Sequence, residues 1–298
     1  MAGDETTQST ENEVARSMWS VFEPVHAVAY FAPGVRAAFE EAGVRGFWRG
    51  YFAGRAAPLG RVPARQVAAA FYGFRYDMVA RAIPSVWDLI EPDDAWTVRR
   101  RACGGDLRVA AERADLTVGD VERAAAFLSD VAERCDGAGR PLFSAHLDLD
   151  EPDDPFERLW QATTLLREHR GDGHVAALVA FGVEPLQSLL IADRLGTVPV
   201  GHAVANRGWT DDDVAAATER LAGRGLVTAV GQPTDASISL RRRVEEHTDE
   251  AAAGVWSTVP PDDRRRTWHV LDTMARAIGD LGWLTYPNPV GVPPPTPS

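Results

Sequence analysis

The sequence has 298 residues, 45% of them hydrophobic, which is enough to bury a substantial core. The net charge of −12 and the absence of lysine disfavour a nucleic-acid binder unless arginines gather on one face, and the two cysteines exclude a disulfide framework. No apolar run has membrane-spanning length, and the acidic start MAGDETTQSTENE does not resemble a signal peptide, so we expect a cytoplasmic protein with no membrane partner.

In chain order, hydrophobic periodicity predicts a mainly α fold. We expect disordered tails at residues 1–11 and 286–298, because these segments are polar or proline-rich and lack periodicity. A helical unit spans residues 12–135 and includes a helix that a Thr117-x-x-Asp120 capping box begins. The segment 136–157 is rich in Gly, Pro and Asp and is predicted to be a linker, followed by a second unit at 158–282.

The two halves share corner motifs at nearly the same offset. Gly43-Val44 recurs as Gly182-Val183, and the corner at 72–74 (YGF) recurs as the corner at 207–209 (RGW). These matches favour two related helical units, the second or both being a winged helix with a short β-hairpin.

An arginine- and aromatic-rich segment, residues 45–61 (RGFWRGYFAGRAAPLGR), is the first candidate binding site. Aromatic rings beside guanidinium groups suit a planar, anionic small molecule, although a core helix whose arginines reach solvent would show the same pattern. The nearby FYGFRY is either a short strand or an aromatic wall. The ligand-binding residues predicted in this half are His26, Tyr30, Trp48, Arg49, Tyr51, Arg55, Tyr72 and Phe74.

The second candidate is EHRGDGH, residues 168–174. Two glycines among charged residues favour a sharp turn between two helices, with Asp172 or Gly173 capping the second. The cluster is then either such a polar corner or one side of a ligand pocket, with His169, Arg170, Asp172 and His174 as binding residues. An enzyme would use His169 or His174 as acid–base, oriented by Asp172 or Glu168. The histidine spacing matches no common zinc motif, so no metal or cofactor is predicted.

Residues 198–245 contain the one recognisable motif. A short helix, an RGW turn and a helix capped by Thr210 precede Gly225-Leu226-Val227, and GQPTDAS then supplies the turn of a hairpin that Ile238-Ser239-Leu240 closes. This order resembles the MarR-type winged helix. The resemblance implies DNA binding through the second helix and the wing, with the cationic residues Arg220, Arg224, Arg241, Arg242 and Arg243 gripping the backbone, and a homodimer.

Two features oppose DNA reading. Three carboxylates, Asp211, Asp212 and Asp213, occupy the start of the second helix, where a major-groove reader contacts bases. The position before the last helix, where the MarR pattern usually carries glycine, reads Asp235-Ala236-Ser237.

Over its whole length the chain also resembles an uncharacterised actinobacterial family of helix-turn-helix proteins. VFEPVHAVAYFAPGVRAAFE, GFWRGYFAGRAAPLG and LREHRGDGHVAAL carry this resemblance. It implies the fold and a bacterial cytoplasmic location. We therefore expect a ligand-responsive transcriptional regulator, or a small-molecule-binding descendant of one. The alternatives are the enzyme on a repurposed winged-helix scaffold and a protein–protein adaptor whose acidic helix meets a basic partner.

Overall fold

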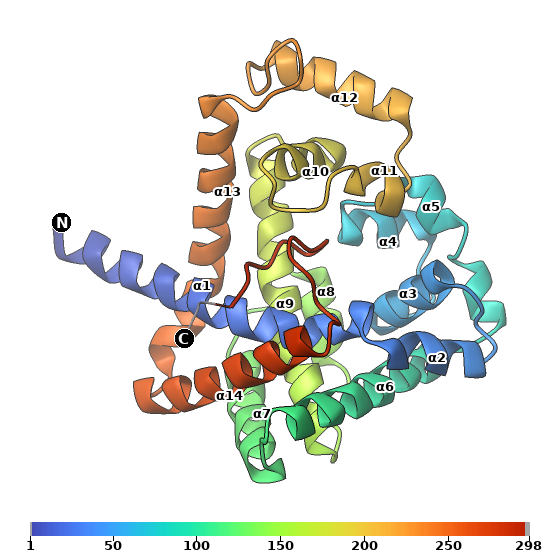
Figure 1. The fold of residues 1–298 in the computed structure, drawn as a ribbon, viewed down its shortest axis with the longest axis vertical. Coiled ribbons are helices and arrows are strands. Elements are labelled where there is room, and N and C mark those ends of the chain that lie inside the picture. Colours follow the sequence, from blue (N-terminus) through green and yellow to red (C-terminus); the bar gives the residue numbers. More distant parts are fainter. Residues whose placement is uncertain (1, 296–298) are drawn as a thin grey trace.

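The computed structural model describes residues 2–295, with side chains from residue 10 onward, and shows a helical protein (Figure 1). This confirms the mainly α prediction, and no strand occurs within residues 2–295. Three short 3-10 helices lie at Ala57–Leu59, Ser85–Asp88 and Gly254–Thr258. The α-helices are α1 (Ala2–Phe31), α2 (Pro33–Glu41), α3 (Phe47–Ala56), α4 (Ala64–Phe71), α5 (Tyr76–Ala80), α6 (Pro92–Arg113), α7 (Val118–Glu133), α8 (Pro141–Leu147), α9 (Pro155–Ala180), α10 (Pro185–Arg194), α11 (His202–Arg207), α12 (Asp211–Gly223), α13 (Asp235–Ala253) and α14 (Pro261–Asp280).

Helix α9 is the central element of the fold. It runs through the middle of the molecule in Figure 1, and helices α1, α6, α7, α8 and α13 pack against it. Its buried residues lie on every face, from Leu159 and Trp160 near its start to Leu178 near its end. A helix surrounded in this way has no solvent stripe, which explains why EHRGDGH shows no simple periodicity.

The turn predicted at EHRGDGH does not form, because the segment lies inside α9. Gly173 serves close packing instead: a Cβ there would lie 2.8 Å from Arg140 Nη1 and 3.2 Å from the Ala251 Cβ. Asp172 caps neither α9 nor a new helix. Its carboxylate accepts hydrogen bonds from the N–H groups of Leu142 and Phe143, at 2.9 and 3.0 Å, and so holds the start of α8.

Helices α10, α11 and α12 follow one another through short turns, and we call them the helix-turn-helix part of the chain. Thr210 and Asp213 form the capping box that begins α12, as Thr117 and Asp120 do for α7. Gly225 has a φ of 70° and lets the Leu226 N–H reach back to the Leu221 carbonyl, which ends the helix where expected.

The wing predicted after α12 is not a β-hairpin. Only one isolated bridge, between Val227 and Pro233, joins the two arms of this turn. Thr234 then caps α13, whose first residue is Asp235. The predicted return strand at 238–240 is therefore helical, because a Thr-x-x-Ser start outweighs the short apolar pattern.

The two halves repeat one order of helices. The ten-residue helices α3 and α10 each follow a Gly-Val turn, at Gly43-Val44 and Gly182-Val183. Both glycines have positive φ, and both valine N–H groups bond to the carbonyl five residues earlier. The corners at 72–74 and 207–209 then follow α4 and α11 at the same stage of each half, which is the pattern expected from a duplication.

The segments predicted to be a linker and tails are more ordered than expected. Residues 136–157 contain α8, whose Phe143 and His146 are completely buried. At the C-terminus, the Asn288 side chain is buried and bonds both the N–H and the carbonyl of Val292. Helix α1 starts at Ala2, within the predicted N-terminal tail, while residues 1 and 296–298 lie outside the described part.

The described residues contain no cluster suited to a metal ion and no single membrane-spanning helix. No group of three or more His, Cys, Asp or Glu side chains there is placed to hold a metal ion. No single helix within residues 2–295 is long and apolar enough to cross a membrane, and the pair α9 and α10, which meets that test together, is bent by 100° at its junction.

Adjacent glycines in α6 give a first prediction about this packing. A Cβ at Gly104 would lie 2.7 Å from Glu157 Cγ and 3.1 Å from the Glu157 backbone N, whereas a Cβ at Gly105 meets nothing within 4 Å. Gly104→Ala is expected to lower the free energy of unfolding by about 1–3 kcal/mol by forcing α9 away. Gly105→Ala is expected to raise it by up to about 1 kcal/mol. Urea unfolding of both variants tests this, and equal effects at the two positions would contradict the packing described.

Candidate functional site

A cavity of about 280 Å³ lies between the N-terminal unit and the helix-turn-helix part. Its walls come from α3, the α4–α5 turn, α9 and α11, with residues 289–290 of the C-terminal segment at one side. Because these elements belong to both halves, a molecule in the cavity would touch both. Polar lining residues include Tyr30, Tyr51, Tyr72, Arg55, Arg167, Glu168, Asp172, His174, Ser188, His202, Asn206 and Arg207.

Aromatic rings form one wall of the cavity. The Trp48 and Tyr51 rings on α3 lie 5.9 and 5.5 Å from the Phe74 ring, measured between centroids. Tyr30 on α1 continues the wall, 5.5 Å from Tyr51. Rings at these separations pack edge-on or tilted, as aromatic clusters prefer. The wall offers apolar ring surfaces to an aromatic ligand.

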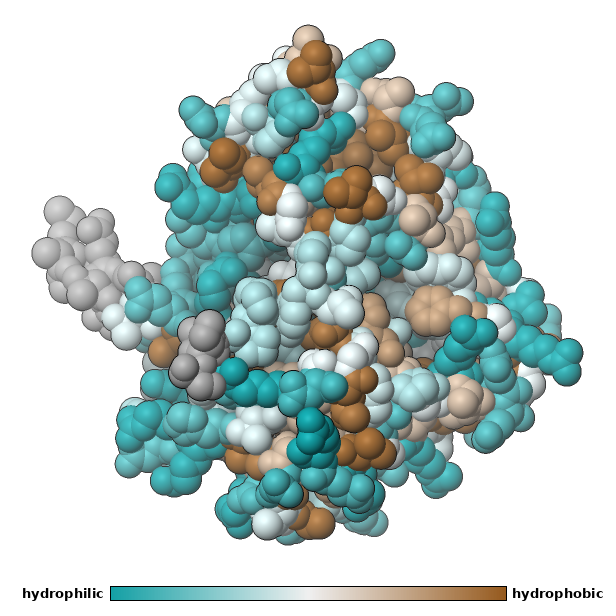
Figure 2. All heavy atoms as spheres, in the orientation of Figure 1, coloured by the Kyte–Doolittle hydropathy of each residue, from teal (hydrophilic) through white to brown (hydrophobic). Residues whose placement is uncertain are grey.

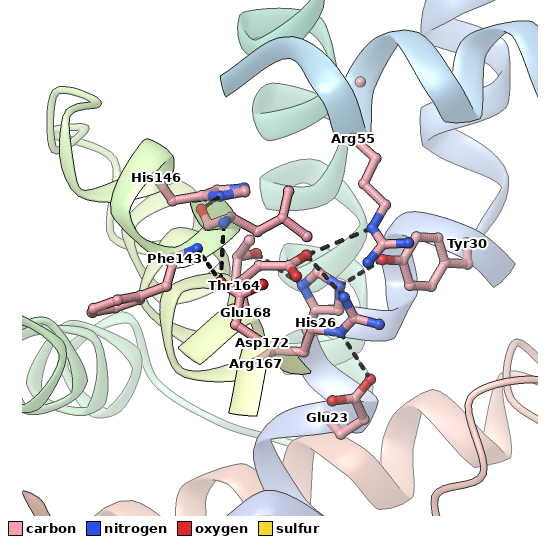
Figure 3. A network of polar contacts seen from close by, with 12 residues as sticks. Glu23, His26, Tyr30, Arg55, Phe143, His146, Thr164, Arg167, Glu168 and Asp172 are labelled. Atoms are coloured by element: carbon pink, nitrogen blue, oxygen red, sulfur yellow. Dashed lines mark hydrogen bonds and ion pairs between the residues drawn. The ribbon is translucent and has the colours of Figure 1, made fainter. Parts of the chain in front are cut away.

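The cavity lining next to this wall is charged (Figure 3). The Glu168 carboxylate lies between two guanidinium groups, 2.9 Å from Arg167 Nη1 and 3.7 Å from Arg55 Nε. Glu168 is 1% exposed. Burial alone would raise the pKa of Glu168, but the charges of Arg167 and Arg55 hold it well below its usual range. Arg167 also lies 3.5 Å from Glu23, which leaves Arg55 the less satisfied of the two cations.

Arg55 is held in place by an aromatic ring, a hydroxyl group and the Glu168 carboxylate. Its guanidinium stacks over the Phe71 ring at 4.0 Å, and Nη1 donates to the Tyr51 hydroxyl at 3.1 Å. The Arg55 side chain is 7% exposed overall, and its Nε has no hydrogen-bond partner among the described residues. Burial raises the pKa of Tyr51, but the charges of Arg55 and Arg207 together hold it below its ordinary value.

A second layer of polar residues supports this side. His26 is completely buried and bonds Thr164 Oγ1 and the Tyr30 hydroxyl, both at 2.9 Å. Burial lowers the pKa of His26 well below its ordinary value, so the imidazole is neutral and orients Tyr30 rather than adding charge. His26 therefore positions a lining residue from behind.

The α4–α5 turn is strained and joined to both neighbouring turns. Tyr72 has a φ of 56°, a conformation that costs a non-glycine residue about 1–3 kcal/mol. Its hydroxyl donates to the Val183 carbonyl in the α9–α10 turn. On its other side, the Trp209 indole N–H donates to the Gly73 carbonyl at 3.0 Å, and the Arg75 N–H donates to the Arg207 carbonyl at 2.9 Å. The two repeated corners thus pair with each other.

The structure brings most of the residues predicted for ligand binding to one cavity. The lining includes Tyr30, Trp48, Tyr51, Arg55, Tyr72, Phe74, Asp172 and His174, and FYGFRY forms an aromatic wall rather than a strand. Four predicted residues do not line it: His26 lies behind Tyr30, and the other three are directed elsewhere. Arg49 is on the exposed face of α3, His169 packs against Phe143, and Arg170 pairs with Asp249 at 2.7 Å. These three are directed away because successive residues of a helix point to different sides.

Sequence reasoning missed Arg167, Phe47 and the α11 residues His202, Asn206 and Arg207. The signal for Arg207 was present, since it begins the repeated corner RGW, but the repeat does not say which way the side chain points. Arg207 stacks over the Phe74 ring at 4.4 Å.

The residues of the enzyme alternative do not form an acid–base pair. Asp172 is directed to the start of α8, and the His174 ring bonds Thr248 Oγ1 at 3.0 Å. His169 lies beside Phe143, and its carbonyl accepts from Arg140. Glu168 is saturated by arginines, so no carboxylate orients either histidine.

The predicted DNA-contacting arginines all have partners within the chain. Arg220 lies 2.8 Å from Glu184, and Arg224 donates to the Gly182 carbonyl at 2.8 Å. Arg241 and Arg242 pair with glutamates one turn later on α13, and Arg243 stacks over Phe181. In the view of Figure 2, which has the orientation of Figure 1, the surface is mainly hydrophilic. Hydrophobic residues gather over the region of α10–α12.

The chain matches the model of a helix-turn-helix family over residues 15–285, and so over both halves and the cavity between them. No curated protein and no solved structure shows a significant match. Since the match covers most of the 298 residues, the chain belongs to this helix-turn-helix family.

Proposed function

We propose that this protein is a ligand-responsive helix-turn-helix regulator, or a descendant of one, that binds a small molecule in the cavity between its two halves. One observation carries the proposal: the same cavity is lined by the aromatic wall of α3 and by the end of α11, the helix that leads into α12. A ligand there would contact both the N-terminal unit and the helix-turn-helix part. Such a position suits a sensor site, because only differential contacts can shift a conformational equilibrium.

DNA binding is the less supported half of this proposal. The family match favours it, whereas Asp211 and Asp212 are exposed at the start of α12 and would face phosphates. Asp213 is already engaged, since it closes the capping box with Thr210 and lies 3.0 Å from Arg75. The exposed ion pair of Arg220 with Glu184 is weak in water, so this arginine can exchange its partner for a phosphate.

Binding to DNA fragments from the protein's own genomic neighbourhood, at two salt concentrations, tests the regulator. We expect sequence-selective binding by the wild type that weakens steeply with salt, by roughly 10³-fold or more between 50 and 200 mM if about six phosphates are contacted. Asp211→Asn/Asp212→Asn should strengthen non-specific binding while leaving Asp213 to cap the helix.

Arg113→Gln is the matched control, because Arg113 lies at the far end of α6 and has only an exposed pair with Asp280. Absence of selective binding by the wild type at both salt concentrations would contradict the regulator. If only the Asn variant bound, and without selectivity, the acidic start of α12 would be shown to exclude DNA.

A further inference from the structure

Arg207 is a half-buried cation with no carboxylate partner among the described residues. It ends α11 and lines the cavity, and its only side-chain hydrogen bond in the described part of the chain goes to the adjacent Asn206 carbonyl, at 3.3 Å. Burial lowers the pKa of Arg207, and the Arg55 charge adds to this, while Tyr51 opposes it. A guanidinium remains charged even so, which leaves an unneutralised positive charge in a confined space.

Arg55 and Arg207 both line the cavity, and each stacks over a phenylalanine ring. Arg55 stacks over the Phe71 ring and Arg207 over the Phe74 ring, and the centroids of these two rings are 6.3 Å apart. Stacking leaves the N–H donors at the rim of each guanidinium plane available. The two cations repel each other, and an anion bound between them would relieve that repulsion.

The charged side chains around the cavity carry a net positive charge. Arg55, Arg167 and Arg207 line it, while Arg99 lies behind Tyr30, 5.5 Å from its ring, with an unpartnered Nη2. The buried carboxylates that oppose these four guanidinium groups are Glu23, Glu168 and Asp172, so one positive charge remains in excess. A chain of net charge −12 therefore keeps an excess of positive charge at this one interior site.

Resting on the proposed function, we infer that the ligand is a planar aromatic anion, such as an aromatic carboxylic acid, whose charged group lies between Arg55 and Arg207 while its ring packs on Trp48, Tyr51 and Phe74. Arg55 comes from the N-terminal unit and Arg207 from the helix-turn-helix part, so the anion bridges the two. A planar carboxylate suits the fork of a guanidinium group, and the flat apolar remainder suits the aromatic wall.

An anion bound to Arg207 would be connected to α12 through the corner next to Arg207. The Arg207 carbonyl accepts from the Arg75 N–H, and Arg75 Nε lies 3.0 Å from Asp213 in the first turn of α12. An anion that fixes Arg207 would therefore also slow the opening of residues 208–216. Ligand binding and the order of the α12 start would be coupled.

Matched pairs of acids and amides test the ligand class. The probes are benzoate and benzamide, 1-naphthoate and 1-naphthamide, and indole-3-acetate and its amide, titrated calorimetrically against the purified full chain. We expect the acid of at least one pair to bind more tightly than its amide. Arg207→Met should weaken the acid by about 10- to 100-fold, as for a lost charged hydrogen bond, and leave the amide unchanged. Arg207→Lys should restore part of the preference.

Arg49→Met is the matched control, since Arg49 lies on the exposed face of α3, outside the cavity, and this variant should bind like the wild type. Hydrogen exchange provides the second readout: the bound acid should slow exchange of residues 208–216 by at least about fivefold in the wild type but not in Arg207→Met. Equal binding of acid and amide, or a preference that survives Arg207→Met, overturns the inference while leaving the cavity a binding site. Absence of binding by every probe overturns the inference and counts against the proposed function.

Discussion

Replacing Glu168 by glutamine is expected to lower the free energy of unfolding by about 3–5 kcal/mol, the cost of leaving a buried charge without its partner. Glu168 is 1% exposed and is the carboxylate that Arg167 and Arg55 share. Glutamine has the same shape but no charge, so two guanidinium groups would remain buried against a neutral amide. Urea unfolding followed by circular dichroism measures the change.

Glu184→Gln is the control for this experiment. Glu184 also pairs with an arginine, Arg220, at 2.8 Å, but both side chains are about half exposed. Exposed pairs contribute about 0–1 kcal/mol, so this variant should differ little from the wild type. If the Glu168 and Glu184 variants lost equal stability, the charged side of the cavity would not be the stabilising network described.

Acidification below neutral pH is expected to destabilise the protein through its buried histidines. Burial lowers the pKa of His146, His169, His174 and His202 to about 4, whereas an unfolded histidine titrates near ~6.5. Between these values the unfolded state binds more protons, so the free energy of unfolding falls as the pH drops.

Two aspartates oppose this trend. Burial raises the pKa of Asp106 and Asp172 to about 6, so the folded state binds their protons first as the pH falls. Burial lowers the pKa of His26 and raises the pKa of Glu23, so these two groups also act in opposite directions. Four histidines against two aspartates leave a net uptake of protons on unfolding near pH 5, and the lowered pKa values of Glu168 and Glu245 add to this uptake as the pH approaches 4.

The variant His146→Gln isolates one of these groups. His146 is completely buried, its Nδ1 donates to the Leu142 carbonyl at 2.7 Å, and its Nε2 has no partner in the described residues. Its loss should reduce proton uptake by about one, which flattens the fall in stability between pH 6.5 and 4. His247→Gln, on the half-exposed side of α13, should keep the wild-type slope. A wild-type stability that rises on acidification would contradict the account.

The sequence predicts local structure well where a single side chain decides it. The capping box at Thr117, the helix cap at Thr210 and the helix end at Gly225 were all predicted, because each depends on residues within one turn. The role of a glycine is harder to predict, because glycine serves both in turns and where helices pack closely. Gly171 and Gly173 suggested a turn, but Gly173 instead lets Arg140 and α13 approach α9. Only the tertiary neighbours distinguish the two uses.

The candidate site could be predicted in part, because some of its residues lie on a single helix face. Trp48, Tyr51 and Arg55 share one helix face, and that face lines the cavity. The contribution of Arg207 could not be predicted, because it depends on the pairing of two corners far apart in the chain. A helix forms in place of the wing because Thr234 caps α13. The short apolar segment at 238–240 suggested a strand instead, so this cap was not predicted.

A cavity-filling variant tests the central claim, that the space between the two halves is a ligand site. Ser188, a small residue on α10, lines the cavity, and Ser188→Trp would occupy it without removing a charged group. The measurement is the shift in thermal unfolding temperature caused by a library of small planar compounds, charged and neutral, on the wild type and on this variant. The account predicts compounds that raise the unfolding temperature of the wild type and have no effect on the folded variant. A library that stabilises neither protein, or both equally, would contradict it.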